Sequence, residues 1–190
     1  MRECQDMYKI LMLGPQGSGK GTQANLLAAR LGVPALSMGQ LLRDEVKSGS
    51  ALGKEIDAII HGEGKLVPDQ TAAEVLKRRL NQSDAANGYV LDGYPRNIAQ
   101  YTVSLQIVQP THVLLVDVPR VESLARLSKR AQLEGRIDDT ADLINIRLEV
   151  YENETKPILQ EYRRAGVLHE VDGMGSVDEV AARIANVLAV

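Results

Sequence analysis

The stretch that decides the fold is Gly14-Pro15-Gln16-Gly17-Ser18-Gly19-Lys20, a GxxxxGK loop. It follows an apolar run at residues 10–13 and opens a segment rich in alanine and leucine, so the sequence places it between a strand and a helix. Glycines in such a turn let successive backbone N–H groups converge on an anion, and the following helix adds the positive end of its dipole. Lys20 supplies a charge that can reach terminal phosphates. The pattern therefore predicts a nucleoside triphosphate site.

Other ligand classes fit this chain poorly. Gly14, Gly17, Gly19 and Gly21 do not follow the G-x-G-x-x-G spacing of a dinucleotide-binding fold. The formal net charge of −3 supplies no general attraction to nucleic acid or to an anionic membrane. Aromatic residues make up 3% of the chain, without Trp or Phe, so it lacks the stacking platforms of a single-strand binder. We expect neither nucleic acid nor a membrane as a partner.

Length and cysteine content predict one cytoplasmic domain. With 190 residues, of which 44% are hydrophobic, the chain can bury one sizeable core. Its single cysteine, Cys4, cannot form an internal disulfide or a structural zinc site, which is typical of a reducing compartment. The polar N-terminus and the absence of a long apolar run indicate neither a signal peptide nor a transmembrane helix. No exposed apolar stripe is evident, so we expect a monomer.

Short apolar runs alternate with longer segments of helical period, which predicts an α/β sandwich with a parallel sheet. The first helix is predicted from about Gly19 to Leu31, because Gly32 ends a helix well and Pro34 cannot continue one. A last helix is predicted over residues 177–190, where apolar residues recur at helical spacing. The predicted strands cover residues 10–13, 89–91, 113–118 and 167–171.

Two segments interrupt this pattern. Between Ser37 and Pro68 the sequence predicts short helical pieces broken by glycines, with no strand candidate, which indicates a helical insertion on the core. Residues 129–136 lie between two helical patterns and are interpreted as a small lid. The second of these patterns is predicted to begin at Asp138-Asp139-Thr140, whose carboxylates and hydroxyl can cap exposed backbone N–H groups.

A second chemical signal is an acid at the end of a predicted strand. Asp92 follows the apolar run at residues 89–91 and precedes Gly93-Tyr94-Pro95-Arg96. In a parallel sheet this position lies at the carboxyl edge, beside the phosphate loop. Mg²⁺ prefers carboxylate and water oxygens, and in phosphoryl transfer the protein supplies few direct ligands. Asp92 is therefore predicted to support Mg²⁺, while a role as the cap of the turn that follows stays open.

Arginines form a third signal. Arg126 and Arg130 are one helical turn apart and share a helix face, as an anion clamp requires, although a solvated helix face has the same spacing. Arg136 and Arg147 differ by eleven positions, close to three helical turns, so they could also point the same way. Together with Lys20 these residues would surround a transferring phosphoryl group with positive charge, where preorganised donors do most of the catalysis.

Four motifs follow one another along nearly the whole chain: residues 14–23, Leu66-Val67-Pro68-Asp69, Asp92-Gly93-Tyr94-Pro95-Arg96 and Gly135-Arg136-Ile137-Asp138-Asp139. They closely resemble the motifs of adenylate kinases of the short-lid form. The Asp-Gly-aromatic-Pro-Arg motif is the most specific of them, because it is a signature of nucleoside monophosphate kinases. The resemblance implies a reversible reaction in which ATP and AMP give two ADP, with Mg²⁺ bound together with ATP.

The resemblance also implies how the chain is divided. Residues 37–66 would form a mobile insertion that binds AMP, and residues 129–137 a short lid. The core would then comprise residues 1–36, 67–128 and 138–190. We expect both smaller segments to close over the substrates, because two charged nucleotides must be held in line while water is kept out.

Individual site residues follow from the same resemblance, and Asp92 would hold Mg²⁺ through water. The implied catalytic residues are Lys20, Arg96, Arg130, Arg136 and Arg147. The implied ATP-binding residues are Gly17, Ser18, Gly19, Lys20, Gly21, Thr22, Arg126, Arg130 and Gly175. The implied AMP-binding residues are Met38, Arg43, Lys65, Leu66, Val67, Gly93, Tyr94, Pro95, Arg96, Gln100, Arg136 and Arg147.

The chain departs from the family pattern beside both predicted nucleotides. Gln16 stands where most members carry proline, and Ser37-Met38-Gly39-Gln40 stands where the family usually reads Ser-Thr-Gly-Asp. Gln40 is still predicted to complete a capping box with Ser37. Met38 offers no hydroxyl to a base, so acceptor selectivity should depend more on Gln100. Its amide can donate and accept at once, as an adenine edge requires.

Two alternatives stay open from the sequence. A UMP/CMP kinase of the same fold would differ only in the acceptor base, and the Arg96-Asn97 pair also occurs in those relatives. A nucleotide-binding module with weak transfer is the other, although the retained arginines weigh against it. The sequence contains no Asn-Lys-x-Asp guanine motif, which weighs against a GTPase switch.

Overall fold

The computed structural model describes residues 7–59, 67–134 and 141–190 of the chain. Its strands form one parallel five-stranded sheet in the order β2-β3-β1-β4-β5, which confirms the predicted α/β fold. The strands are β1 Tyr8–Leu13, β2 Ala35–Ser37, β3 Gly88–Asp92, β4 His112–Asp117 and β5 Leu168–Asp172.

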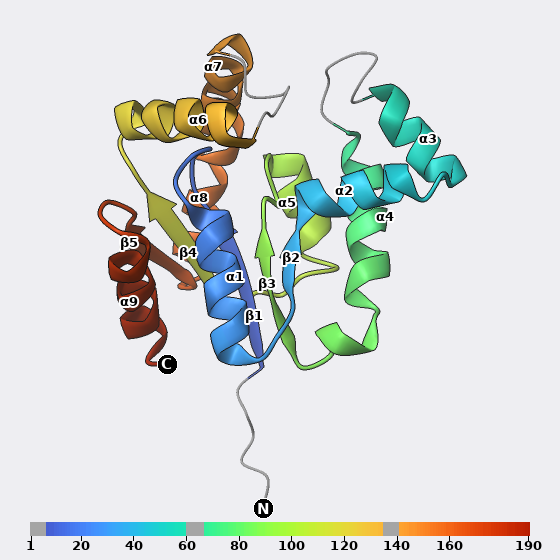
Figure 1. The fold of residues 1–190 in the computed structure, drawn as a ribbon. Coiled ribbons are helices and arrows are strands. Elements are labelled where there is room, and N and C mark those ends of the chain that lie inside the picture. Colours follow the sequence, from blue (N-terminus) through green and yellow to red (C-terminus); the bar gives the residue numbers. More distant parts are fainter. Residues whose placement is uncertain (1–6, 60–66, 135–140) are drawn as a thin grey trace, which may run out of the picture.

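Helices connect the strands and cover both faces of the sheet (Figure 1). The α-helices are α1 Lys20–Leu31, α2 Met38–Lys47, α3 Ala51–Asp57, α4 Asp69–Leu80, α5 Ile98–Ser104, α6 Arg120–Glu134, α7 Ala141–Val150, α8 Ile158–Arg164 and α9 Val177–Leu188. Shorter pieces are the 3₁₀-helix η2 Ser83–Ala85 and the π-helix η3 Tyr151–Thr155.

The central strand β1 contributes to two hydrophobic cores. Ile10 and Met12 pack with residues of α1 and α9 on one face of the sheet, whereas Leu11 and Leu13 pack with residues of α4 and α8 on the other. All of these side chains are buried. Because successive side chains of a strand point to opposite faces, a continuous apolar strand can serve both cores at once. The carboxyl end of β1 is thereby fixed from both sides.

Two groups of helices stand beyond the carboxyl edge of the sheet (Figure 1). On one side β2 leads directly into α2, which packs against α3; on the other side β4 is followed by α6, which contacts α7. The carboxyl edge is where parallel α/β sheets bind their ligands. Chain segments that are far apart in the sequence therefore flank the position expected for a ligand.

The predicted first and last helices are confirmed. α1 ends at Gly32, whose φ of 67° gives the left-handed C-cap expected of glycine. α9 begins with a capping box, in which the Ser176 hydroxyl accepts from the backbone N–H of Glu179 and the Glu179 carboxylate accepts from that of Ser176. Local sequence signals are enough to set these boundaries.

The short helical pieces predicted between Ser37 and Pro68 are present as α2 and α3, but the prediction lacks β2 and ends a helix too early, at residue 129. The sequence does not predict β2, because only Leu36 of its three residues is buried and the segment shows no apolar run. Pairing with β3 makes it a strand. Residues 129–134 belong to α6, since they contain good helix formers and no glycine or proline. The remainder of the predicted lid and the helix start at Asp138-Asp139-Thr140 lie outside the described residues, as does Cys4.

The predicted capping box at the start of α2 is also wrong. Ser37 is the N-cap residue, but its side chain makes no capping hydrogen bond. The Gln40 amide instead accepts a bond of 2.8 Å from Arg43 and donates one of 2.7 Å to Asp44. Hydrogen bonds to charged partners are stronger than those to a neutral N–H group, which explains why Gln40 turns toward its charged neighbours.

Gly88 provides a test of the close packing of β1 against β3. Its φ is 127°, and a Cβ atom at this position would lie 2.4 Å from the carbonyl oxygen of Tyr8, its register partner on β1. We predict that Gly88→Ala lowers the free energy of unfolding by about 2 kcal/mol more than Gly166→Ala does, because backbone must shift to relieve the clash. Urea denaturation measures both values.

Gly166 is the matched control because its φ of 71° is also positive, while a Cβ atom there would meet no described atom within 4 Å. The control variant therefore carries part of the strain of a positive φ angle without the clash, because 71° lies near the left-handed region that other residues occasionally adopt and 127° does not. Equal losses of stability in the two variants would show that the close approach of Tyr8 to Gly88 is unimportant.

Candidate active site

The phosphate loop connects β1 to α1 and depends on glycine for space as well as conformation. A Cβ atom on Gly14 would lie 2.3 Å from the carbonyl oxygen of Val116 in β4, and one on Gly17 would lie 2.7 Å from that of Ser123 in α6. Both glycines have positive φ angles, of 146° and 82°. Side chains at these positions would push the loop away from β4 and α6. The loop is thereby held at the carboxyl edge.

Lys20 lies among other charged side chains at the end of this loop. Its Nζ donates a hydrogen bond of 3.1 Å to the carbonyl oxygen of Pro15. Burial lowers the pKa of the Lys20 ammonium; the charge of Asp92 opposes this effect, and the nearby Arg96 and Arg130 guanidinium groups add to it. The structure therefore brings these predicted catalytic cations close enough to repel one another, with Asp92 opposing that repulsion.

Asp92 is positioned by the pairing of β3 with β1. It ends β3 opposite Met12, and its Oδ2 lies 3.3 Å from the position that a Cβ atom on Gly21 would occupy at the start of α1. Its Oδ1 is buried without a hydrogen-bond partner among the described residues. An unpartnered buried carboxylate oxygen beside a phosphate loop suits a hydrated Mg²⁺ ion, which binds few protein ligands. The residues present therefore fit the predicted metal.

Arg96 is held at several points of its backbone and side chain. Its Nε donates to the carbonyl oxygen of Gly93 at 2.9 Å, and its backbone N–H donates to Gln100 Oε1 at 2.8 Å. Burial lowers the pKa of the Arg96 guanidinium, the charge of Asp92 opposes this, and Arg147 lowers it further. Guanidinium groups nevertheless stay protonated in proteins. Asp92 and Arg147 therefore have opposite electrostatic effects on the Arg96 guanidinium.

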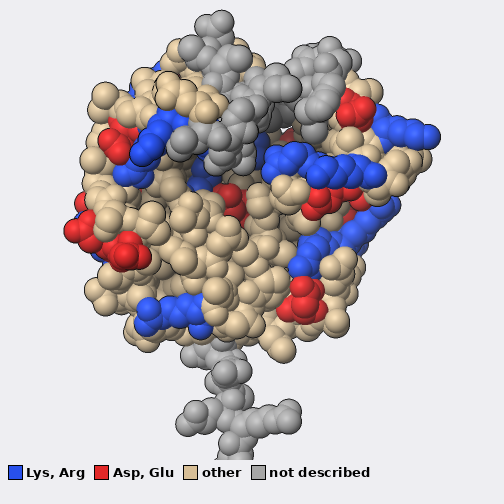
Figure 2. Space-filling view, in the orientation of Figure 1, with Lys and Arg blue, Asp and Glu red and all other residues tan. Residues whose placement is uncertain are grey.

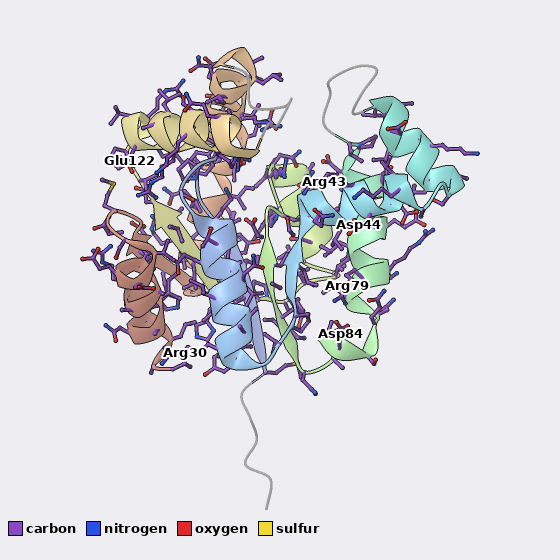
Figure 3. All side chains as sticks on the ribbon, in the orientation of Figure 1. Arg30, Arg43, Asp44, Arg79, Asp84 and Glu122 are labelled. Atoms are coloured by element: carbon purple, nitrogen blue, oxygen red, sulfur yellow. The ribbon has the colours of Figure 1, made fainter. Side chains whose placement is uncertain are left out.

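Arg126 connects the phosphate loop to the loop that follows β5. Its Nη1 donates to the carbonyl oxygen of Ser18 at 3.3 Å and its Nη2 to that of Gly173 at 3.1 Å. Its Nε donates to Glu122 at 2.6 Å, one turn earlier on α6, where Figure 3 labels the acid. The side chain is thus engaged with the core rather than lying on a solvated helix face. Gly175 lies two residues beyond Gly173 and adopts a φ of 100°.

On the other side of the site, α2 presents Arg43 near the carboxyl edge, beside Asp44 (Figure 3). Arg43 is exposed and held by Gln40, as described above. Met38 is buried next to Gly93, with its Cβ atom 3.9 Å from the position of a Cβ on that glycine. Figure 2 shows basic surface on both sides of a hollow at this edge, with acidic surface between.

The predicted AMP-binding residues do not all face open space. Tyr94 is a core residue, and burial raises its pKa to about 12. Its peptide bond to Pro95 is cis. Gln100 is buried as well, and its Oε1 is engaged by Arg96, which leaves its Nε2 donors for another partner. Val67 is buried too. Lys65, Leu66 and Arg136 lie outside the described residues.

Sequence reasoning missed residues that fix the loop after β3. The Asn97 side chain caps α5 by accepting from the Gln100 N–H at 2.7 Å, and it donates to Asp69 at the start of α4 at 3.1 Å. The Thr155 hydroxyl donates to the carbonyl oxygen of Arg96 at 2.6 Å. An Asn before an apolar helical segment is a recognisable capping signal. Nothing local in the sequence indicates the bond from Thr155.

Comparison with known proteins identifies the family of this site. A family model described as adenylate kinase matches residues 12–167. The chain belongs to the adenylate kinase family. The adenylate kinase of Kocuria rhizophila is 42% identical over 94% of this chain and 97% of its own length. Those of Leifsonia xyli subsp. xyli and Bifidobacterium longum are 41% and 42% identical, over 95% and 93% of this chain and 92% and 97% of their own lengths.

Membership of the adenylate kinase family makes the chain a phosphotransferase of the nucleoside monophosphate kinase class. Enzymes of this family use ATP, generally with Mg²⁺. Within the described residues, no group of His, Cys, Asp or Glu is arranged to hold a metal on protein ligands alone. None of the described helices has the length and apolar character that a membrane span needs.

The burial of Lys20 among other cations in this adenylate kinase family site predicts a cost in stability. Because the pKa of Lys20 is lower in the folded chain than in the unfolded chain, its charge destabilises the fold at neutral pH. We predict that Lys20→Met raises the free energy of unfolding of the ligand-free protein by about 0.5–2 kcal/mol. Urea denaturation at neutral pH measures this gain.

The pH dependence gives the same prediction a second measurement. The difference between Lys20→Met and the wild type should shrink as pH rises from the lowered pKa of the folded chain to the ordinary lysine value of the unfolded chain, since folded wild-type protein has then lost the destabilising charge. Lys77→Met in α4 is the control, because Lys77 is an exposed lysine. A Lys20→Met protein that is no more stable than the Lys77→Met protein would contradict the prediction.

Proposed function

We propose that the chain catalyses the reversible, Mg²⁺-dependent transfer of a phosphoryl group from ATP to AMP, giving two ADP. The observation that carries the proposal is the gathering of Asp92, Arg96 and Arg130 around Lys20 at the carboxyl edge of the sheet. A transferring phosphoryl group spreads negative charge over its oxygens, and fixed cations around it lower the barrier. The family of the chain and the names of its relatives favour this activity over a UMP/CMP kinase.

The donor side of the proposed site is the phosphate loop. We assign the ATP phosphates to residues 17–22, whose backbone N–H groups and helix start attract anions. Lys20 exchanges its bond to the Pro15 carbonyl for the terminal phosphates. Arg126 and Gly175 lie toward the nucleoside, because Arg126 joins the phosphate loop to the neighbouring Gly173. Arg130 faces the transferring group from α6.

Asp92 is the residue that would hold Mg²⁺, through water, on its unpartnered Oδ1. When bound, the ion neutralises charge on the phosphate oxygens. The Asp92 carboxylate also offsets the repulsion between Lys20 and Arg96. Asp92 is therefore proposed both to bind the metal ion and to reduce the repulsion between the protein's own cations.

The acceptor side lies between α2 and the loop after β3. Arg96 and Arg43 are proposed to bind the AMP phosphate, and Arg147 approaches it from α7. Gln100 would read the adenine through its Nε2 donors, since its Oε1 holds Arg96. Met38 lines the pocket as an apolar wall beside Gly93. Lys65, Leu66, Val67 and Arg136 complete the set that the family pattern assigns to AMP.

Segment closure is part of the proposal. The described helices of the two segments, α2 and α3 on one side and the end of α6 on the other, stand beyond the carboxyl edge. Closure of the insertion at residues 37–66 and of the segment at 129–137 would exclude water, the competing acceptor. The helical continuation of α6 through Glu134 means that residues 129–134 would move as part of a helix. We propose a monomer as the active form, and light scattering of the active fraction measures its mass.

An acceptor panel tests the proposed reaction. Purified protein is incubated with Mg²⁺-ATP and, separately, with AMP, dAMP, CMP, UMP or GMP, and nucleoside diphosphates are quantified by chromatography. Selective conversion of AMP, lost when EDTA removes Mg²⁺, is the expected result. Conversion of CMP or UMP in preference to AMP would make the chain a pyrimidine nucleotide kinase. ATP binding without transfer to any acceptor would leave a binding module.

Lys20→Met separates catalysis from folding in this assay. We predict that turnover falls by a factor of about 100 or more, because a donor that acts on the transition state is lost. The same variant should be at least as stable as the wild type, as argued above. Turnover close to the wild-type value would remove Lys20 from the catalytic role.

Gln100→Ala tests the reading of the acceptor base. We predict that the KM for AMP rises by a factor of about 10, while the KM for ATP changes little, because a buried donor to the base is lost. Initial rates with either nucleotide varied give both constants. Thr102→Val on the same helix serves as a control, since Thr102 is exposed. Equal increases in the two KM values would mean that Gln100 does not read the acceptor base.

A further inference from the structure

The π-helix η3 brings a hydroxyl to the loop that carries Arg96. η3 connects α7 to α8, and its wider turn is closed by a bond of 2.8 Å from the Lys156 N–H to the carbonyl oxygen of Tyr151, five residues earlier. Thr155, the last residue of η3, is 8% exposed. Its Oγ1 donates a hydrogen bond of 2.6 Å to the carbonyl oxygen of Arg96. Single π-turns within helices are frequent at functional sites.

This bond differs in origin from the other bonds that hold Arg96. Gly93 and Gln100, which bind its Nε and its backbone N–H, belong to the same short stretch of chain as Arg96 itself. Thr155 lies 59 positions away in the sequence. The local bonds can fix the shape of the loop, but they cannot fix its place relative to α7 and η3. The Thr155 hydroxyl joins these two parts of the molecule.

The helix that Thr155 terminates also carries a proposed acceptor ligand. Arg147 lies on α7, which runs directly into η3, and its charge acts on the Arg96 guanidinium. The two cations repel one another, which favours separation of the loop from the helix when no phosphate lies between them, while Asp92 acts on Arg96 in the opposite sense. A hydrogen bond from the helix to the backbone of Arg96 opposes that separation.

We propose that Thr155 is a positioning residue that anchors the Arg96 backbone to the α7–η3 helix and thereby sets the spacing of Arg96 and Arg147 on the acceptor phosphate. The proposal rests on the proposed function, because it assumes that both arginines bind AMP. The proposal attributes this positioning of the two arginines to the Thr155 hydroxyl group alone. A buried threonine that merely satisfied its own hydrogen bond would affect stability without favouring one substrate over the other.

The test compares Thr155→Val, which keeps the shape and removes the hydroxyl, with Thr155→Ser, which keeps the hydroxyl. For Thr155→Val we expect kcat/KM for AMP to fall by a factor of about 10, which corresponds to one lost hydrogen bond, while the KM for ATP stays within about twofold of wild type. Thr155→Ser should recover most of the loss. Thr102→Val is the matched control, because the exposed Thr102 hydroxyl also donates to a carbonyl oxygen, that of Ile98 at 3.0 Å.

A double-mutant cycle shows whether Thr155 acts through the Arg96 side chain. In an Arg96→Ala background there is no guanidinium to position, so Thr155→Val should leave the Kd for AMP, measured by calorimetry, unchanged. Its effect on the melting temperature should persist in that background. An equal loss of AMP affinity in both backgrounds would overturn the proposal and leave a purely structural bond.

The outcomes also separate this inference from the proposed function. A wild-type protein that converts AMP, together with a Thr155→Val protein that has the same kinetic constants as Thr102→Val, overturns the inference alone. Equal losses toward ATP and AMP in Thr155→Val also overturn it. A wild-type protein that transfers no phosphoryl group to AMP overturns the proposed function, and the inference with it.

Discussion

Repulsion between cations is the constraint on which the site depends. Arg96 and Arg130 lie close enough to Lys20 for their charges to add to the lowering of its pKa by burial, and the carboxylate of Asp92 opposes this effect. The cations remain together because the core fixes the elements that carry them. A phosphate group relieves the repulsion, whereas a neutral ligand would not. The folded chain is therefore preorganised for an anion, as phosphoryl transfer requires.

The sheet holds these charged residues together because it fixes the carboxyl ends of neighbouring strands side by side. Met12 and Asp92 are register partners on β1 and β3, so the phosphate loop and the acid emerge side by side. Because β1 is buried on both faces, the core keeps these strand ends in place despite the repulsion between the cations of the site. Gly14 and Gly17 then let the loop contact β4 and α6 at distances that side chains would not permit. The positions of the charged residues in the site thus depend on the packing of the core.

Polar bonds between distant segments complete the site where apolar packing ends. Arg126 joins the phosphate loop to Gly173, and Asn97 joins the loop after β3 to α4. Such bonds are directional, so each fixes an orientation that apolar contact would leave free.

The sequence by itself determined the features that depend on neighbouring residues. The phosphate loop, the stop of α1 at Gly32 and the acid at the end of β3 were predictable, because glycine conformation, capping and strand alternation act over a few residues. Tertiary structure alone decided that β2 pairs with β3 and that Thr155 bonds to Arg96. Those partners are far apart in the chain, and a hydrogen bond between them exists only after packing has brought them together.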